Sequence, residues 1–89
     1  MKAIVTVVGK DRVGIIAGVC NHLAEKNINI LDISQTVMQG YFTMMMATDV
    51  SAANIPLAEL ATRMEEAGKE MGLSIRIQRE DIFEAMHRI

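Results

Sequence analysis

The sequence predicts an α+β fold of the ferredoxin-like type. This is a βαββαβ sandwich of four antiparallel strands with two helices on one face, here followed by a short C-terminal helical tail. Strand-type and helix-type patterns follow one another in that order along the 89 residues. Both helix-type stretches have one apolar and one polar side, as helices that cover a sheet do. Because each crossover should be right-handed, both helices are expected on the same face.

The predicted strands differ in how much of their surface is apolar. Residues 3–8 are β-branched almost throughout and apolar on both alternating faces, which is typical of a central strand. Residues 41–48, the third strand, are also apolar on both faces, whereas residues 73–78 alternate as a half-buried strand does. The link Gln39-Gly40 between the second and third strands predicts a tight two-residue hairpin.

The second predicted strand, residues 28–38, contains a change of register. Its apolar residues lie on one alternating face as far as Ile30 and on the other face from Leu31 onward. A single extra residue produces such a switch, so a β-bulge is expected near residues 30–32.

The stretch from Val8 to Ile15 joins the first strand to a helix expected over residues 13–26. Free N–H groups at a helix N-terminus carry partial positive charge and bind a carboxylate or a phosphate without a basic side chain. Gly9 and Gly14 allow a sharp turn and the close approach of a ligand. With Asp11 as the predicted N-cap, this loop is expected to form one wall of a small-molecule site.

Four further residues predict where the helices begin and end. Asn27 is expected to adopt the left-handed conformation that ends the first helix. Asn54 is the predicted N-cap of the second helix, with Pro56 in its first turn. Gly72 is expected to end that helix.

Gly68 lies on the apolar side of the second predicted helix. A glycine there weakens the helix by roughly 1 kcal/mol, and close packing of the helix on the sheet is the expected compensation.

The sheet face that carries no helix should be partly apolar, because the first and third strands are apolar on both sides. Residues 1–79 are predicted to form one domain, and residues 80–89 an amphipathic tail that packs on the domain or on its partner. The tail has apolar residues at helical spacing: Ile82, Phe83, Met86 and Ile89. Either this tail or a second copy of the chain is expected to cover the face.

Composition excludes several classes of protein. A net charge of −2 and three aromatic residues argue against binding to nucleic acid. No stretch approaches the ~18 apolar residues of a membrane span, and the N-terminus lacks a signal-peptide pattern. The single cysteine, Cys20, excludes an internal disulfide and is predicted to be a buried, inert thiol. A cytoplasmic protein is therefore expected.

Motifs for catalysis and metal binding are missing from the sequence. It has no Cys-x-x-Cys pair, and its two histidines, His22 and His87, lie on separate predicted elements. It also contains no phosphate-binding loop and no nucleophile–base spacing that supports a catalytic site. The expectation is a protein that is not an enzyme and has no metal and no cofactor.

With the loop and the element order in place, the chain resembles an ACT domain, a small regulatory module found beside many enzymes of amino-acid metabolism. The resemblance is carried by residues 9–15, Gly-Lys-Asp-Arg-Val-Gly-Ile, and by residues 23–35, and it extends to about Gln78. It is similar to free-standing ACT proteins and to one module of the glycine-cleavage-system regulator. Val13 departs from the proline that the family commonly has before the loop glycine, which leaves this loop less rigid.

The resemblance implies a homodimer that pairs through the second strand, with a ligand between the first loop of one protomer and the second strand of the other. Backbone groups of the first loop would face the ligand, and Asn29 of the partner subunit would offer its amide. Carried over by position, the loop residues are Asp11, Arg12, Val13, Gly14 and Ile15. A zwitterion needs N–H donors for its carboxylate and an acceptor for its ammonium group, and Asp11 is the candidate acceptor.

Two hypotheses follow. The first is a non-catalytic regulatory module that binds an amino acid or a similar small carboxylate at a homodimer interface. The alternative is a ligand-free interaction module in which the free sheet face and residues 81–89 bind a partner protein. In that case Asp11 would only cap the helix, and Gly14 and Asn29 would serve only packing and turn formation.

Overall fold

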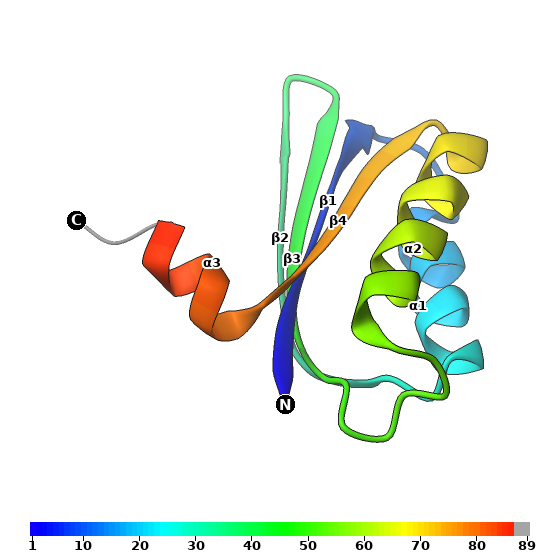
Figure 1. The fold of residues 1–89 in the computed structure, drawn as a ribbon. Coiled ribbons are helices and arrows are strands. Elements are labelled where there is room, and N and C mark those ends of the chain that lie inside the picture. The colour runs from blue at the N-terminus through cyan, green and yellow to red at the C-terminus, as the bar shows by residue number, and fades with distance from the viewer. Residues whose placement is uncertain (87–89) are drawn as a thin grey trace.

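The computed structural model describes residues 1–86, and it confirms the predicted ferredoxin-like fold (Figure 1). The sheet has the strand order β2-β3-β1-β4 with antiparallel pairing throughout. Helices α1 and α2 both cover one face of it, whereas α3 lies on the other side (Figure 1). The elements are β1 (Lys2–Lys10), α1 (Ile15–Glu25), β2 (Asn29–Met38), β3 (Tyr41–Asp49), α2 (Leu57–Met71), β4 (Leu73–Arg79) and α3 (Glu80–Met86).

The core lies between the sheet and the two helices. In the central strand β1, Val5 pairs with Met46 of β3 on one side and with Ile77 of β4 on the other. All three side chains point toward the helices and are buried. The helices complete the core with fully buried side chains at Val19, Leu23, Leu60 and Met64. Strand alternation therefore divides the sheet into a helix-covered face and an open face.

Two predicted irregularities of the sheet are confirmed. The register between β2 and β3 shifts between Ile30 and Asp32, where the β-bulge was expected. The hairpin that joins these strands turns at Gln39 and Gly40, whose φ angles of 51° and 80° are both left-handed. Two successive left-handed residues are typical of the two-residue turns that match strand twist.

The helix C-termini follow the prediction, and the N-termini do not. Asn27 has φ 60° after α1, and Gly72 is the left-handed C-cap of α2 with φ 72°. Asp11 does not cap α1, because the helix begins after Gly14, which is the N-cap and has no side chain to offer. The predicted cap at Asn54 is also wrong.

Asn54 has a different structural role from the one predicted. Pro56 is the N-cap of α2, and it makes no side-chain cap. The side-chain amide of Asn54 donates to the carbonyl of Glu25 at 3.1 Å, and its backbone N–H donates to the carbonyl of Lys26 at 3.2 Å. These bonds satisfy carbonyls at the C-terminus of α1. No N–H group within the helix donates to carbonyls at this end. Asn54 therefore joins the loop before α2 to the end of α1.

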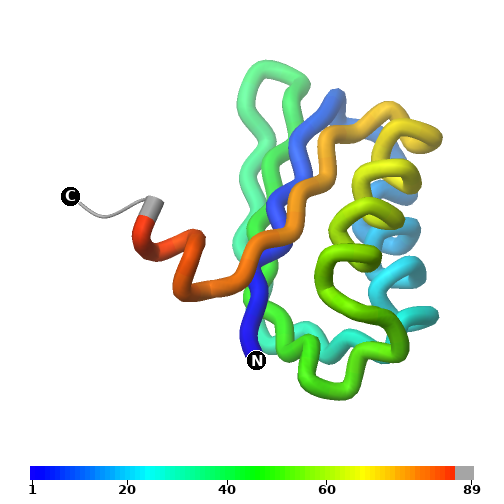
Figure 2. The backbone as a smooth tube through the Cα atoms, in the orientation of Figure 1, coloured from blue at the N-terminus to red at the C-terminus, as the bar shows by residue number. Residues whose placement is uncertain are grey.

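Helix α3 follows β4 directly and projects from the open face of the sheet (Figures 1 and 2). It lies near β1 and β4, and Phe83 is half-buried while Ile82 is 46% exposed. The tail predicted for residues 80–89 thus contains a helix over its first seven residues. Residues 87–89, including the predicted contact at Ile89, lie outside the described part of the chain.

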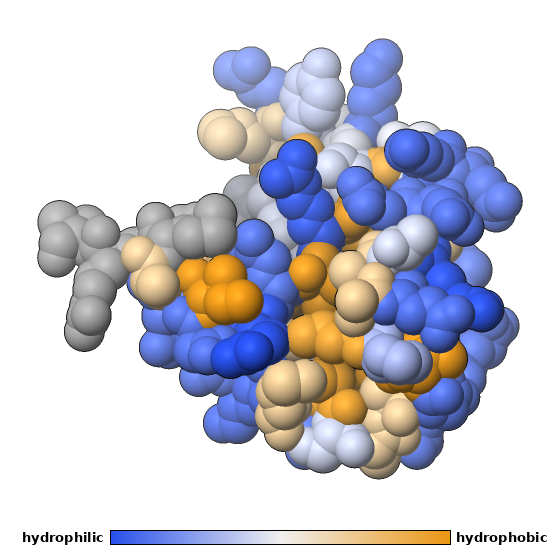
Figure 3. Space-filling model, in the orientation of Figure 1, coloured by the Kyte–Doolittle hydropathy of each residue, from blue (hydrophilic) through white to orange (hydrophobic). Residues whose placement is uncertain are grey.

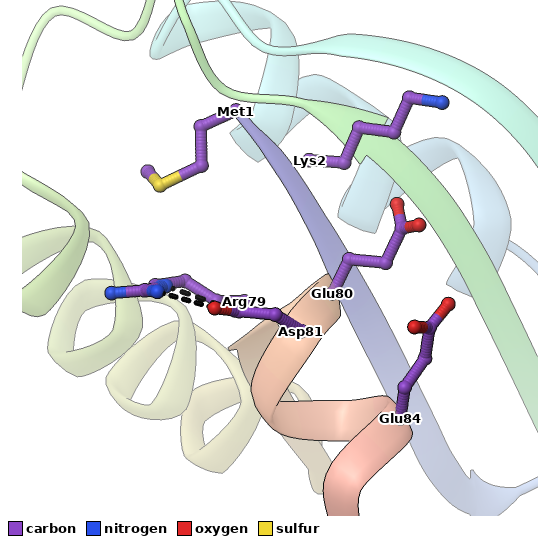
Figure 4. Close-up of a pocket in the computed structure, with 6 residues that line it drawn as sticks. All are labelled: Met1, Lys2, Arg79, Glu80, Asp81 and Glu84. Atoms are coloured by element: carbon purple, nitrogen blue, oxygen red, sulfur yellow. Dashed lines mark hydrogen bonds and ion pairs between the residues drawn. The ribbon is translucent and has the colours of Figure 1, made fainter.

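The start of α3 is held by an ion pair between Arg79 and Asp81, whose two hydrogen bonds are drawn in Figure 4. The hydrogen bonds from Arg79 lower the pKa of the Asp81 carboxyl, and the same contact raises the pKa of Arg79. A carboxylate with a lowered pKa stabilises the folded state above its ordinary pKa, and this contribution is lost as the pH falls through the folded-state value.

We therefore expect α3 to loosen selectively below about pH 4, where an ordinary aspartate takes up its proton. Hydrogen exchange of the α3 amides, measured between pH 5 and pH 3 and corrected for intrinsic rates, checks this. The variant Asp81→Asn should show the loosened state at both pH values. An α3 that is equally protected at both pH values in the unmodified protein would contradict the assignment.

Candidate functional site

The loop between β1 and α1 exposes an uncapped helix N-terminus. Residues 11–14 are all exposed, and Gly14 has φ 91°. No side chain caps α1, and no acidic residue stands in its first turn. The N–H of Gly18 makes the first bond of the helix, to the carbonyl of Gly14 at 2.9 Å. The N–H groups of the preceding turn therefore have no acceptor within the helix, so their partial positive charge is open to an anion.

Space above Gly14 is open as well. A Cβ placed on Gly14 would meet no heavy atom within 4 Å. The next residue back, Val13, has a side chain that is 98% exposed. A small ligand can therefore reach the first turn of α1 without displacing any side chain of the same chain.

The loop is anchored at both of its sides. The backbone N–H of Asp11 donates to the carbonyl of Gly40 in the β2–β3 hairpin, at 2.8 Å. The guanidinium of Arg12 donates to the carbonyl of Met71 at the end of α2. The N–H of Asp11 and the side chain of Arg12 are therefore engaged within the chain, whereas the carboxylate of Asp11 remains exposed.

The sequence does not reveal these anchors. Gly40 and Met71 contribute carbonyl oxygens, which every residue carries, so no residue type marks them. Their distance along the chain from the loop, 59 residues for Arg12 to Met71, leaves no local pattern either. The anchors connect the loop to the edge hairpin on one side and to α2 on the other.

Asn29, the sixth predicted site residue, lies far from the loop in the same chain. It pairs with Asp49, which pairs with Lys2, so it stands at the N-terminal end of β1. The loop leaves the opposite end of β1, where the β2–β3 hairpin lies (Figure 2). A strand of this length spans about 30 Å. One protomer alone therefore does not bring Asn29 to the other five residues.

Strand β2 is an edge of the sheet with little protection against pairing. Nine of its ten residues are exposed, and Asp32 is its one charged residue. On the helix-covered side, Ile33 is 41% and Val37 54% exposed, because α1 and α2 do not reach over them. The other edge, β4, carries two arginines in seven residues. Charges and short length protect an edge, so β2 is the edge open to a further strand.

The remaining features of the described residues are the possible metal ligands, the cysteine and a second hollow. No cluster of histidine, cysteine, aspartate and glutamate in residues 1–86 has the geometry of a metal site. Cys20, predicted to be buried, is half-buried in α1. The hollow in Figure 4, about 280 Å³ and lined in part by Glu80 and Glu84, lies beside α3 at the far end of β1 from the loop. None of the helices within residues 1–86 is long and apolar enough to cross a membrane.

Comparison with known proteins identifies the family. The ACT domain family matches residues 2–78 of the chain. The chain belongs to the ACT domain family. The ACT domain matches the stretch that carries the two sequence motifs and all six predicted site residues. Membership of this family implies a regulatory role that involves the binding of small molecules.

Relatives and solved structures agree with this assignment. A UPF0237 protein of Clostridium acetobutylicum is 58% identical over 89 residues, covering 100% of both chains. A structure described as an ACT domain protein from Streptococcus pneumoniae is 48% identical, with a TM-score of 0.83 and 98% of each chain covered. A putative glycine cleavage system transcriptional repressor shares the fold at 22% identity and a TM-score of 0.73, covering 86% of this chain and 44% of that chain.

Proposed function

We propose that this ACT protein is a non-catalytic regulator that binds an amino acid or a similar small carboxylate between two copies of the chain. The observation that carries the proposal is the uncapped N-terminus of α1, exposed beneath open space at Gly14. Helix N-termini without a side-chain cap bind carboxylates through backbone N–H groups and the helix dipole. The ligand carboxylate would occupy this end of α1.

The other groups of the loop suit the remainder of a zwitterion. The exposed carboxylate of Asp11 is the acceptor for the ligand ammonium group. Backbone groups of Arg12, Val13, Gly14 and Ile15 surround the helix end, while the guanidinium of Arg12 donates to the carbonyl of Met71. The loop then binds the ligand through its backbone groups and the carboxylate of Asp11, and the side chain of Arg12 fixes the loop in place.

The partner subunit supplies the other side of the proposed ligand site. When two β2 edges pair antiparallel about a two-fold axis, the start of one β2 lies beside the end of the other. In such a dimer, Asn29 of the partner subunit would lie at the end of the sheet where the loop of the first protomer lies. Exposed Ile33 and Val37 support this pairing, since antiparallel edges would bring these apolar side chains together.

Ligand binding in such a site is coupled to pairing. A ligand that contacts both protomers binds the paired state better than the separate chains, so it shifts the equilibrium toward pairing. The hydrogen bond from Asp11 to Gly40 joins the ligand loop to the hairpin that ends the pairing edge. Regulation of a partner enzyme would use this change in assembly.

The first experiment is a thermal-shift screen of the purified protein against the common amino acids and their keto acids. A ligand at ~100 times its dissociation constant should stabilise the protein by about 2.7 kcal/mol. The substitution Asn29→Ala should abolish the shift, because the partner's amide is lost. Asn21→Ala makes the same change at an exposed position on α1 and should leave the shift intact.

Two results would contradict the proposal. One is the absence of any shift across the whole panel with a well-folded protein. The other is a shift that Asn29→Ala and Asn21→Ala affect equally. Either would favour the second candidate, a ligand-free interaction module, for which the exposed apolar residues on the open sheet face are the supporting observation.

A further inference from the structure

The face of the sheet opposite α1 and α2 has an apolar groove at one end. Helix α3 forms one side of the groove, and strands β1, β2 and β3 form its floor. Its volume is about 450 Å³, and its apolar residues are Ile4, Leu31, Ala47 and Phe83. A second hollow of about 230 Å³ shares Ile4 and Ala47 with it and extends along the strands to Met45. The groove has a size within the ~300–1,000 Å³ range of binding clefts.

The strands beneath the groove have the composition of strands that are covered on both faces. On β1, Val8 is 41% exposed next to the fully buried Val7. On β3, Met45 is 38% exposed between the fully buried Met44 and Met46. Strands that are apolar on both faces are typical of sheets with a layer of helices on each side. On this face only the short helix α3 is present within residues 1–86, and its own hydrophobic surface reaches solvent (Figure 3).

The rim of the groove is acidic. Asp32 lies on β2, while Glu80 and Glu84 lie on α3, and one basic residue, Lys2, accompanies them. The side chains of Glu80 and Glu84 point in the same direction from α3, away from the ion pair at the start of the helix (Figure 4). None of the three carboxylates forms an ion pair with a residue in the described part of the chain. The groove is therefore complementary to a segment that carries basic side chains beside apolar ones.

The chain's own helices do not have this charge. Helix α1 contains no lysine or arginine, and α2 has four glutamates against two basic residues. Helix α3 carries acidic charges only. A helix from a second copy of residues 1–86 would therefore bring acidic or neutral surface to an acidic rim. The charges point to a helix of a different protein.

We propose that the groove binds a basic amphipathic helix of a partner protein, which lies on the open face beside α3. The apolar side of this helix would pack on Ile4, Leu31 and Ala47. Its lysine or arginine side chains would face Asp32 on one flank and the two glutamates of α3 on the other. Helices that bind in grooves place their apolar anchors at positions i, i+3, i+4 and i+7. The partner helix would cover this face of the sheet as α1 and α2 cover the other.

The inference does not rest on the proposed function. Asn29 lies on the same face, since it pairs with Asp49, whose other neighbour is Lys2, but it is not among the residues that line the groove. The proposed ligand site also needs the first loop, which lies at the opposite end of β1. Each of the two proposals can therefore fail while the other holds.

The test uses a fluorescent synthetic peptide of about 14 residues, which spans about 21 Å as a helix. Leucines form one side of this helix and lysines the other. One comparison peptide has glutamate in place of every lysine. Another has the composition of the first, but its leucines are distributed around the whole helix. Fluorescence anisotropy should show that the first peptide binds at least about tenfold more tightly than either comparison peptide.

Variants of the protein place the binding in the groove. Glu80→Gln with Glu84→Gln should weaken binding of the first peptide about tenfold, because two charge partners on α3 are lost. Ala47→Arg puts a bulky cation on the floor that both hollows share and should abolish binding. Glu66→Gln with Glu70→Gln removes two exposed glutamates of the same spacing from α2 and should leave binding unchanged. Melting curves confirm that each variant is folded.

A further variant separates the loss of charge from a change in α3. Asp32→Asn removes a carboxylate on the opposite flank, without altering α3, and should weaken binding about threefold. Equal binding of all three peptides, equal effects of the α3 and α2 variants, full binding to Ala47→Arg or full binding to Asp32→Asn would each overturn the inference. An amino-acid thermal shift should persist in the α3 and Ala47 variants, so failure of the groove is distinguished from failure of the ligand site.

Discussion

Substituting Gly68→Val should reduce the free energy of unfolding by about 3 kcal/mol, the upper part of the range for overpacking a core. A Cβ at Gly68 would lie 2.9 Å from the carbonyl oxygen of Leu73 and 3.0 Å from Cγ1 of Ile75. The oxygen belongs to the backbone that turns from α2 into β4, and Leu73 is paired with Gly9 of β1. The backbone therefore has little freedom to move away, and valine adds two further methyl groups.

Chemical denaturation measures this loss, and a domain of this size should show a fall in Tm of more than about 10 °C. Gly68→Ala should lose less, about 1 kcal/mol, because the gain of roughly 1 kcal/mol in helix propensity offsets part of the clash. Ala58→Val, exposed on the same helix, is the matched control and should cost only the helix-propensity difference. A Gly68→Val variant as stable as this control would show that α2 does not pack on β4 as described.

The sequence predicted features that depend on local pattern. The parity change at Ile30 and Leu31 predicted the bulge, because a strand has a period of two and one extra residue inverts it. Gln39-Gly40 predicted the hairpin, and Asn27 and Gly72 predicted the helix ends, because few residues adopt left-handed φ angles easily. Gly68 predicted close packing of α2 on the sheet, which the contacts with Leu73 and Ile75 confirm.

Features that depend on contacts distant in sequence were not predicted. Asp11 has the side chain of a good N-cap, but its N–H bonds to Gly40 and holds it away from the helix, which starts at Gly14 instead. Asn54 was mistaken for a cap because the carbonyls that it serves, those of Glu25 and Lys26, lie far back in the chain. The separation of Asn29 from the loop likewise depends on strand order, which no local pattern contains.

The uncapped N-terminus of α1 has either a ligand-binding role or a purely structural role. The two roles predict opposite effects on ligand binding when a carboxylate is placed beside it. Ala17 is exposed in the first turn of α1, whose N-cap is Gly14. In Ala17→Glu, the new carboxylate lies beside the free N–H groups and interacts favourably with the helix dipole. The ligand-free protein should therefore gain about 0.3–1 kcal/mol in its free energy of unfolding.

The same carboxylate should weaken amino-acid binding by at least about tenfold, because it occupies the N–H groups and repels the ligand carboxylate. Denaturation without ligand and calorimetric titration with the amino acid found in the thermal-shift screen measure the two effects. Ala24→Glu, near the C-terminal end of α1, is the matched control, which should lower stability slightly and leave binding unchanged. If Ala17→Glu raised stability and left affinity intact, the ligand would bind elsewhere, and the free helix end would be a structural feature without a partner.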